Sequence, residues 1–159
     1  MIDNPYAAPG AAVRDVPAAG PYRLYSPGQV AGGAFLGGPI GAIYFLWANF
    51  RALGNHHAAQ RTLIFGAFFI AIMVVVLPLL PESFPSLPIT IAYVLFARHV
   101  AEKHQMTKQA IADSDVHYFH SNWRVGSLGL ICLVASVIAM LGPMLLLAAT
   151  GIWDPLGLY

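Results

Sequence analysis

The chain alternates between long apolar stretches and short charged segments. No Asp, Glu, Lys or Arg falls within 24–50, 62–81, 83–97 or 125–153, which are uncharged runs of 27, 20, 15 and 29 residues. About 20 apolar residues are needed to cross the core of a bilayer as a helix. The pattern therefore predicts an all-α fold, a polytopic transmembrane helical bundle with four spans at about 27–50, 62–80, 87–100 and 125–150.

The third of these segments is short, and it leaves a second arrangement open. Pro81 and Pro85 mark a turn before it, and Pro88 suits the first turn of a new helix. Arg98 near its end can extend to the interface, so its charge does not have to end the span. The alternative is three spans plus an interfacial segment. In either arrangement, residues 101–123 form a connection that we place in the cytoplasm.

The first span has a well-marked beginning. Ser26, Pro27 and Gln29 fit a capping box with proline in the first helical position. Before it, residues 1–24 are rich in Pro and Ala, and we expect a disordered tail. That tail has no basic segment followed by an apolar one, so no signal peptide is expected. We expect the first span to serve as the membrane anchor.

A row of small residues follows within the first span. Gly33, Gly37 and Gly41 are four residues apart and would share one face of a helix. Helices in lipid associate through close packing at small residues. We therefore predict that these glycines form a helix-packing face, either within the chain or between copies. The competing interpretation is loose backbone around Pro39, which the glycines would only tolerate.

Composition agrees with a membrane protein and excludes several other classes. Of the 159 residues, 58% are hydrophobic and 9% are charged, against about 25% charged in soluble domains. The net charge of +1 gives no electrostatic basis for binding nucleic acid. The single cysteine, Cys132, excludes an internal disulfide and any CxxC motif.

The basic residues give an orientation but not a span count. Four spans place both termini outside, with six basic residues in the cytoplasm and Arg14 and Arg23 outside. Three spans with the N-terminus inside give the same division of six to two. The distribution of Lys and Arg therefore does not decide between the two arrangements.

Histidine clusters suggest an alternative function. His117 and His120 would lie on one face if their segment were helical, and Asp113 is close in sequence. Imidazole and carboxylate are common ligands of divalent metals. These three residues are weak metal candidates, because solvated histidines are also frequent where helices meet water.

No motif for catalysis appears in the sequence. The first, second and fourth spans have no ionisable residue of the kind that coupled transporters use. We find no HExxH, no phosphate loop and no Ser/His/Asp pattern. We therefore expect a non-enzyme without a cofactor. Its partners would be the lipid bilayer and either itself or another membrane protein.

One segment resembles a known group of proteins. It begins with Tyr25-Ser26-Pro27 and Gln29, continues with Phe-Leu-Gly-Gly-Pro over 35–39, and ends with Asn49, Leu53 and Gly54. This segment is similar to one in uncharacterised small bacterial multi-pass membrane proteins. The resemblance implies a bacterial cytoplasmic (inner) membrane and carries no activity. The functional hypotheses are an accessory or assembly module that packs through its glycine-rich first helix and, alternatively, a metal-binding or metal-transport-related protein.

Overall fold

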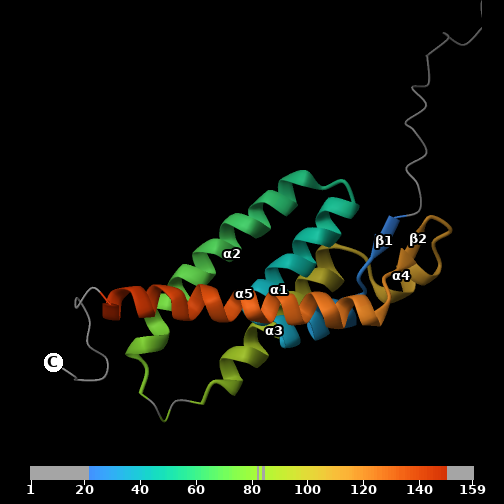
Figure 1. The fold of residues 1–159 in the computed structure, drawn as a ribbon. Helices are drawn as coiled ribbons and strands as arrows, with labels where there is room; N and C mark the ends of the chain where they lie inside the picture. The colour runs from blue at the N-terminus through green and yellow to red at the C-terminus, as the bar shows by residue number, and fades with distance from the viewer. Residues whose placement is uncertain (1–21, 82, 84, 150–159) are drawn as a thin grey trace, which may run out of the picture.

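A computed structural model describes residues 22–81, 83 and 85–149 of the chain (Figure 1). This part is mostly helical, with two short strands. The elements are β1 Tyr22–Leu24, α1 Pro27–Ala52, α2 His56–Val76, the 3-10 turn η1 Leu77–Leu79, α3 Leu87–His104, α4 Lys108–Ala112, β2 His117–Phe119 and α5 Asn122–Ala149. Within the described residues, three helices are long and apolar enough to cross a membrane, namely α1, α2 and α5.

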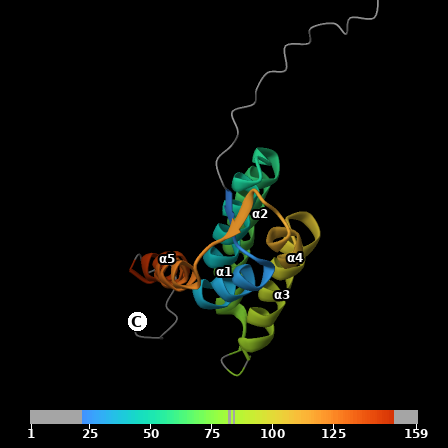
Figure 2. The same ribbon diagram turned by 90° about the vertical axis from the view of Figure 1, so that its right-hand side faces the viewer.

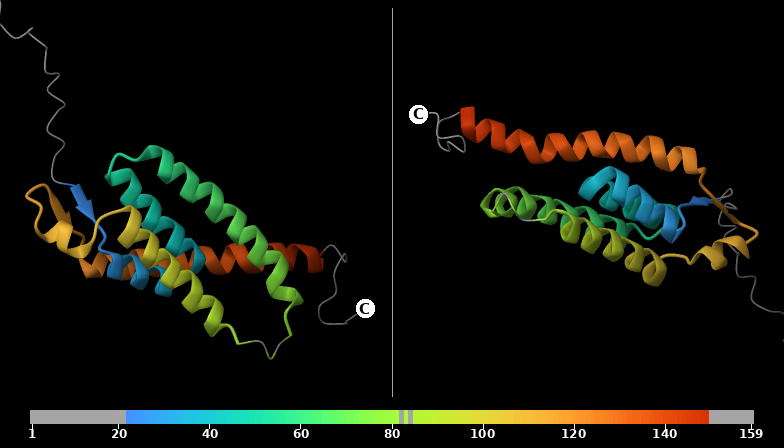
Figure 3. Two further views of the ribbon diagram at one scale, coloured as in Figure 1. Left: turned by 180° about the vertical axis from the view of Figure 1, so that it is seen from behind. Right: turned by 90° about the horizontal axis from the view of Figure 1, so that it is seen from below.

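The elements form a bundle with two distinct ends. The strands, the turn from α1 to α2, the last turn of α3, α4 and the first turn of α5 gather at one end, which we call the strand end (Figures 1 and 3). The connection from α2 to α3 and the last turn of α5 lie at the opposite end, which we call the far end. The helices α2, α3 and α5 therefore each run from one end of the bundle to the other.

Helix α1 occupies the centre of the bundle. It lies between α5 on one side and the pair α2 and α3 on the other (Figure 2). In its most apolar stretch 44% of the residues are buried, against 11% in α2 and 17% in α5. The core residues Val30, Ala34 and Phe45, all on α1, are fully buried. The outer helices instead expose most of their apolar side chains.

Helix α1 is broken in its middle and folds back on itself. Gly38 has φ 64° and ψ −157°, a conformation that is far from helical and open almost only to glycine. Gly33 and Gly41, on either side of the break, lie in contact, and a Cβ on Gly41 would be 2.5 Å from the carbonyl oxygen of Gly33. In a straight helix these residues would be separated by about 12 Å along the axis. The two halves, 27–37 and 39–52, therefore form a helical hairpin with its bend at Gly38.

The open end of this hairpin is held together by one buried side chain. The backbone N–H of Tyr25 donates to Oδ1 of Asn49 at 2.8 Å, and Nδ2 of Asn49 donates to the carbonyl oxygen of Tyr25 at 2.7 Å. A straight helix would separate these positions by about 36 Å. Both ends of α1 therefore lie at the strand end. A single continuous helix over 27–50, which the sequence pattern predicts, is wrong because the break reverses the direction of the chain.

The bend is stabilised by a hydroxyl group from α5. Oγ of Ser136 donates to the carbonyl oxygen of Gly37 at 2.8 Å and accepts from the N–H of Ile40 at 3.2 Å. These are backbone groups next to the break. Gly37, Gly38 and Pro39 are all buried, so water does not replace the missing bonds. Buried backbone groups at a break of this kind need hydrogen-bond partners, and the Ser136 hydroxyl supplies them.

We expect Ser136→Ala to destabilise the bend. The change leaves the buried carbonyl oxygen of Gly37 and the half-buried N–H of Ile40 without a partner. Each interhelical hydrogen bond in a membrane contributes about 0.6 kcal/mol on average, up to about 1.7. The free energy of unfolding in detergent should fall by about 1–2 kcal/mol. Ser127→Ala is a matched control, because the Ser127 hydroxyl is exposed and bonds only within its own helix. Equal stability of the two variants would contradict a role for Ser136 at the bend.

Several local expectations can be compared with the structure. The capping box is confirmed, because Ser26 Oγ accepts from the N–H of Gln29 and Gln29 Oε1 accepts from the N–H of Ser26. Residues 1–21 of the expected tail lie outside the described part of the chain, but Tyr22–Leu24, also assigned to that tail, form β1. The second helix begins at His56, six residues before the expected start, with Asn55 as its cap.

The strands tie the beginning of the chain to the connection before α5. β1 pairs in parallel with β2, so that Tyr22 faces His117 and Leu24 faces Phe119. Residues 101–123, expected only as a connection, thus contain α4, β2 and the last turn of α3.

Candidate functional site

Polar side chains converge at the strand end, next to the open end of the α1 hairpin. We call this group the polar junction; its members are Tyr25, Ser26, Gln29, Asn49, Gln105, His120 and Asn122. Asn49 Nδ2 donates to Gln105 Oε1 at 2.8 Å, and Gln105 Nε2 donates to the carbonyl oxygen of Leu46 at 3.0 Å. The end of α3 is thereby fixed to the second half of α1.

Gln29 makes the corresponding link to α5. Its Nε2 donates to the carbonyl oxygen of His120 at 2.7 Å and to Oδ1 of Asn122 at 2.8 Å. Its Oε1 is already used in the capping box of α1. One glutamine therefore caps α1 and holds the segment that leads into α5. The amides of the polar junction are engaged in structural hydrogen bonds, which favours a role in fixing the fold.

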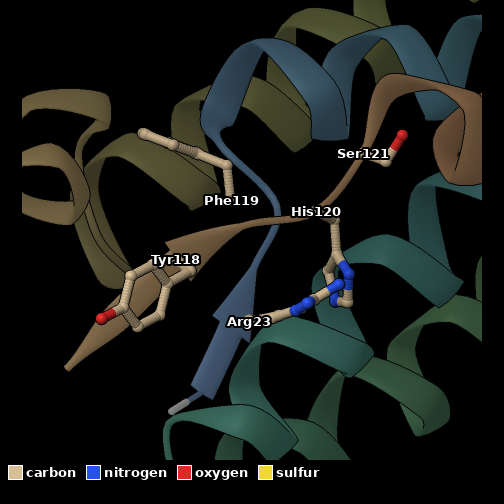
Figure 4. A pocket seen from close by; sticks show the side chains of 5 residues that line it. All are labelled: Arg23, Tyr118, Phe119, His120 and Ser121. Carbon is tan, nitrogen blue, oxygen red and sulfur yellow. The ribbon is translucent and has the colours of Figure 1, made fainter.

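Next to the junction lies a small surface pocket of about 580 Å³ (Figure 4). It is lined by Arg23, Tyr118, Phe119, His120 and Ser121. The guanidinium of Arg23 and the ring of His120 converge, whereas Tyr118 points away from them. The His120 ring also stacks on Tyr25, with centroids 4.2 Å apart. Nδ1 of His120 is buried and has no hydrogen-bond partner among the described residues.

The surroundings of His120 favour its neutral form. Burial lowers the pKa of the imidazole below its ordinary value, and the positive charges of Arg124 and Arg23 lower it further. As the pH falls, the imidazole of His120 therefore becomes protonated in the unfolded chain at a higher pH than in the folded chain. The stability that this difference provides is complete above the unfolded pKa of about 6.5 and is lost as the pH falls below it.

We therefore expect the thermal stability in detergent to fall between pH 7.5 and pH 5 in part through His120. A His120→Phe variant keeps an aromatic ring against Tyr25 and removes the titration, so its melting temperature should decline less over this range. His57→Phe, at an exposed position at the start of α2, is the control and should behave as wild type. A His120→Phe variant with the same pH profile as wild type would exclude this contribution.

The three weak metal candidates do not form a shared site. Residues 117–119 are a strand, so His117 and His120 do not occupy one helical face. Nδ1 of His117 is hydrogen-bonded to Ser114 Oγ at 2.8 Å, while His120 stacks on Tyr25. Asp113 caps the end of α4. Among the residues that the structure describes, no three His, Cys, Asp or Glu side chains are grouped as a metal would require.

The three glycines of the predicted packing face are all in close contacts, but not along one face. Gly33 and Gly41 face each other inside the α1 hairpin, where Gly33 also lies against the ring of Phe45. Gly37 instead contacts Cys132 and Gly129 of α5. Tight packing and a break near Pro39, which the sequence presents as competing interpretations, occur together. The contacts of all three glycines lie within the chain.

A second hollow lies between α2 and α3. It is an apolar groove of about 960 Å³ with the second half of α1 as its floor. Its lining is almost entirely hydrocarbon and aromatic, with Arg61 and His104 toward the strand end. No sequence motif marks this groove, because its walls come from three separate helices.

Comparison with protein-family models, with curated proteins and with solved structures finds no match for this chain. Its function is therefore inferred from its own geometry.

Proposed function

We propose that the chain is a multi-pass protein of the bacterial cytoplasmic membrane in which α2, α3 and α5 cross the bilayer and α1 is re-entrant. The observation that carries this proposal is the pair of hydrogen bonds between Tyr25 and Asn49, which hold both ends of α1 together. Each half of α1 is about 16–21 Å long, whereas the hydrocarbon core is about 30 Å thick. The hairpin therefore enters the membrane and leaves on the same side.

The distribution of charge supports this arrangement. All the basic residues that the structure describes belong to the strand end or to helix turns next to it. They are Arg23, Arg51, Arg61, Arg98, Lys103, Lys108 and Arg124. Arg14 precedes β1 without an intervening apolar span. All eight Lys and Arg residues then fall on one side, compared with six to two in the arrangements expected from hydropathy. By the positive-inside rule the strand end is cytoplasmic.

The crossing of α3 depends on its first three turns, which carry no charged residue. Its charged residues Arg98, Glu102 and Lys103 all lie in its last two turns, and Arg98 Nε is paired with Glu102 Oε1 at 2.8 Å. These side chains can reach the cytoplasmic interface while the apolar residues before them remain in the bilayer. The full length of 18 residues corresponds to about 27 Å of helix, close to the hydrocarbon thickness.

Within that membrane we propose a non-enzymatic accessory or assembly module. Its contacts with partners would come from its outer helices, since the glycine contacts of α1 are used inside the chain. A stripe on α5 exposes large apolar side chains at intervals of three or four residues: Leu130, Val134, Ile138, Leu141 and Leu145. Such a face suits lipid or a second transmembrane helix. No observation favours the metal-related alternative over this one.

The proposal is tested by purification from native membranes in a mild detergent. We expect the chain to resist extraction by alkaline carbonate and to migrate as a complex larger than its monomer, with another membrane protein or a second copy in fixed ratio. A double variant of the α5 stripe, Val134→Ser with Ile138→Ser, should lose the complex while remaining folded. Extraction by carbonate would contradict membrane insertion, and a monomer in native membranes would contradict the assembly role.

A further inference from the structure

The groove between α2 and α3 exists because both helices pack on α1 rather than on each other. Gly66 allows α2 to approach Ile43 of α1 closely, and Ala97 of α3 is fully buried in the core. These contacts fix the two walls at a distance set by the hairpin between them. The groove is therefore a consequence of the folded-back α1.

The chemistry of the groove changes along its length. Toward the far end it is lined by Phe65, Phe69 and Met73 of α2 and by Ile89 and Phe96 of α3. The stretch from Arg61 to Met73 measures about 18 Å along α2. That is close to half the thickness of a bilayer core of about 30 Å, which is the depth of one leaflet. The apolar part thus has the length of a lipid chain in a single leaflet.

The strand end of the groove is cationic. Arg61 and His104 face it from α2 and α3, and its lining includes no acidic residue. Arg61 takes part in no ion pair within the described part of the chain, where the only salt bridge joins Arg98 to Glu102. A guanidinium at this position can bind phosphate through two hydrogen bonds.

We propose that this groove is a binding site for an anionic phospholipid, with an acyl chain along its apolar floor and the phosphate group at Arg61 and His104. Charge decides this occupant over a second copy of the chain. The described helices carry one acidic residue, Glu102, which is already paired with Arg98. A helix from another copy would fill the apolar part but bring no negative charge to Arg61.

The test uses the full chain purified in mild detergent and native mass spectrometry with two lipids that share acyl chains, phosphatidylglycerol and phosphatidylcholine. Wild type should retain phosphatidylglycerol preferentially. The Arg61→Gln substitution should lower the affinity of the protein for phosphatidylglycerol about fivefold, as expected for the loss of one basic group at an anionic lipid surface. Arg51→Gln removes the same charge from an exposed position outside the groove and should have little effect.

A second pair of variants tests the apolar part. Ala92→Trp places a large ring in the groove at an exposed position, and it should abolish retention of phosphatidylglycerol. Leu95→Trp, also exposed on α3 but outside the groove lining, should not. Equal retention of both lipids by wild type would overturn the proposal, as would equal losses in Arg61→Gln and Arg51→Gln. A change of oligomeric state in Ala92→Trp without loss of lipid would assign the groove to a second copy instead.

Discussion

Gly41→Leu should separate the two halves of α1 and cause the largest loss of stability of any single substitution considered. Any Cβ at position 41 falls 2.5 Å from the backbone oxygen of Gly33 and 3.6 Å from Cα of Ala34. These are backbone atoms, so no side-chain rotation relieves the clash. Overpacking costs about 1–3 kcal/mol and occasionally more, and we expect about 3 kcal/mol or more here because the hairpin must open.

The matched control for this prediction is Gly32→Leu. Gly32 lies on the same helix, one residue from Gly33, and a Cβ there would have no atom within 4 Å. Thermal unfolding in detergent should therefore show a strong loss for position 41 and little change for position 32. If both variants lose stability equally, the loss reflects a general need for glycine in this helix and the hairpin contact is not responsible.

Asn49→Leu should have the second-largest effect. The substitution removes the partner of the backbone N–H and C=O of Tyr25 and also that of Gln105 Oε1. Asn49 and Tyr25 are 3% and 2% exposed, so water does not readily replace these bonds. An unsatisfied buried polar group costs about 1–3 kcal/mol, and two of them give an expected loss of about 3 kcal/mol.

Asn122→Leu serves as the comparison for Asn49→Leu. Asn122 also accepts a side-chain hydrogen bond, from Gln29, but this bond is exposed. We expect its replacement to change the free energy of unfolding by less than about 0.5 kcal/mol, as for most surface sites. Chemical denaturation of the two variants in the same detergent measures the difference. A small effect at both positions would mean that the open end of the hairpin is held by packing alone.

The sequence predicts the helices well because their signals are local. The uncharged runs and the capping box at Ser26 and Gln29 depend on neighbouring residues, and the helix beginning at Pro27 follows from them. The glycines at 33, 37 and 41 all lie in close contacts, although these contacts are not along the single face that their spacing predicts. Each of these predictions requires only the periodicity of one segment.

The reversal of α1 could not be predicted in the same way. A break at Gly38 leaves the hydropathy of residues 27–50 unchanged, so a hairpin and a spanning helix have the same apolar profile. What distinguishes them is the contact of Asn49 with Tyr25 and that of Ser136 with Gly37, which join residues far apart in sequence. A buried Asn and Ser within apolar stretches are the available signals, because such groups need partners.

The groove and the polar junction are hidden from the sequence for a related reason. Gln29, Gln105 and Asn122 come from three different segments: Gln29 bonds to Asn122, whereas Gln105 bonds to Asn49, which reaches Tyr25 only once α1 has folded back. The prediction that His117 and His120 share a face is wrong for a different reason. The spacing of His117 and His120 indicates a shared face only in a helix, and the segment forms a strand because it pairs with β1.

The proposed re-entrant course of α1 is tested most directly by the side of the membrane from which its two flanks are labelled. Three single-cysteine variants, Tyr22→Cys, His57→Cys and Ser83→Cys, are each made in a Cys132→Ala background. Positions 22 and 57 are exposed and flank α1, and position 83 is the reference for the far end. A membrane-impermeant maleimide is applied to spheroplasts and to inverted vesicles. We expect positions 22 and 57 to react only in inverted vesicles and position 83 only in spheroplasts. Labelling of 22 and 57 from opposite sides would show that α1 crosses the membrane and would contradict this account.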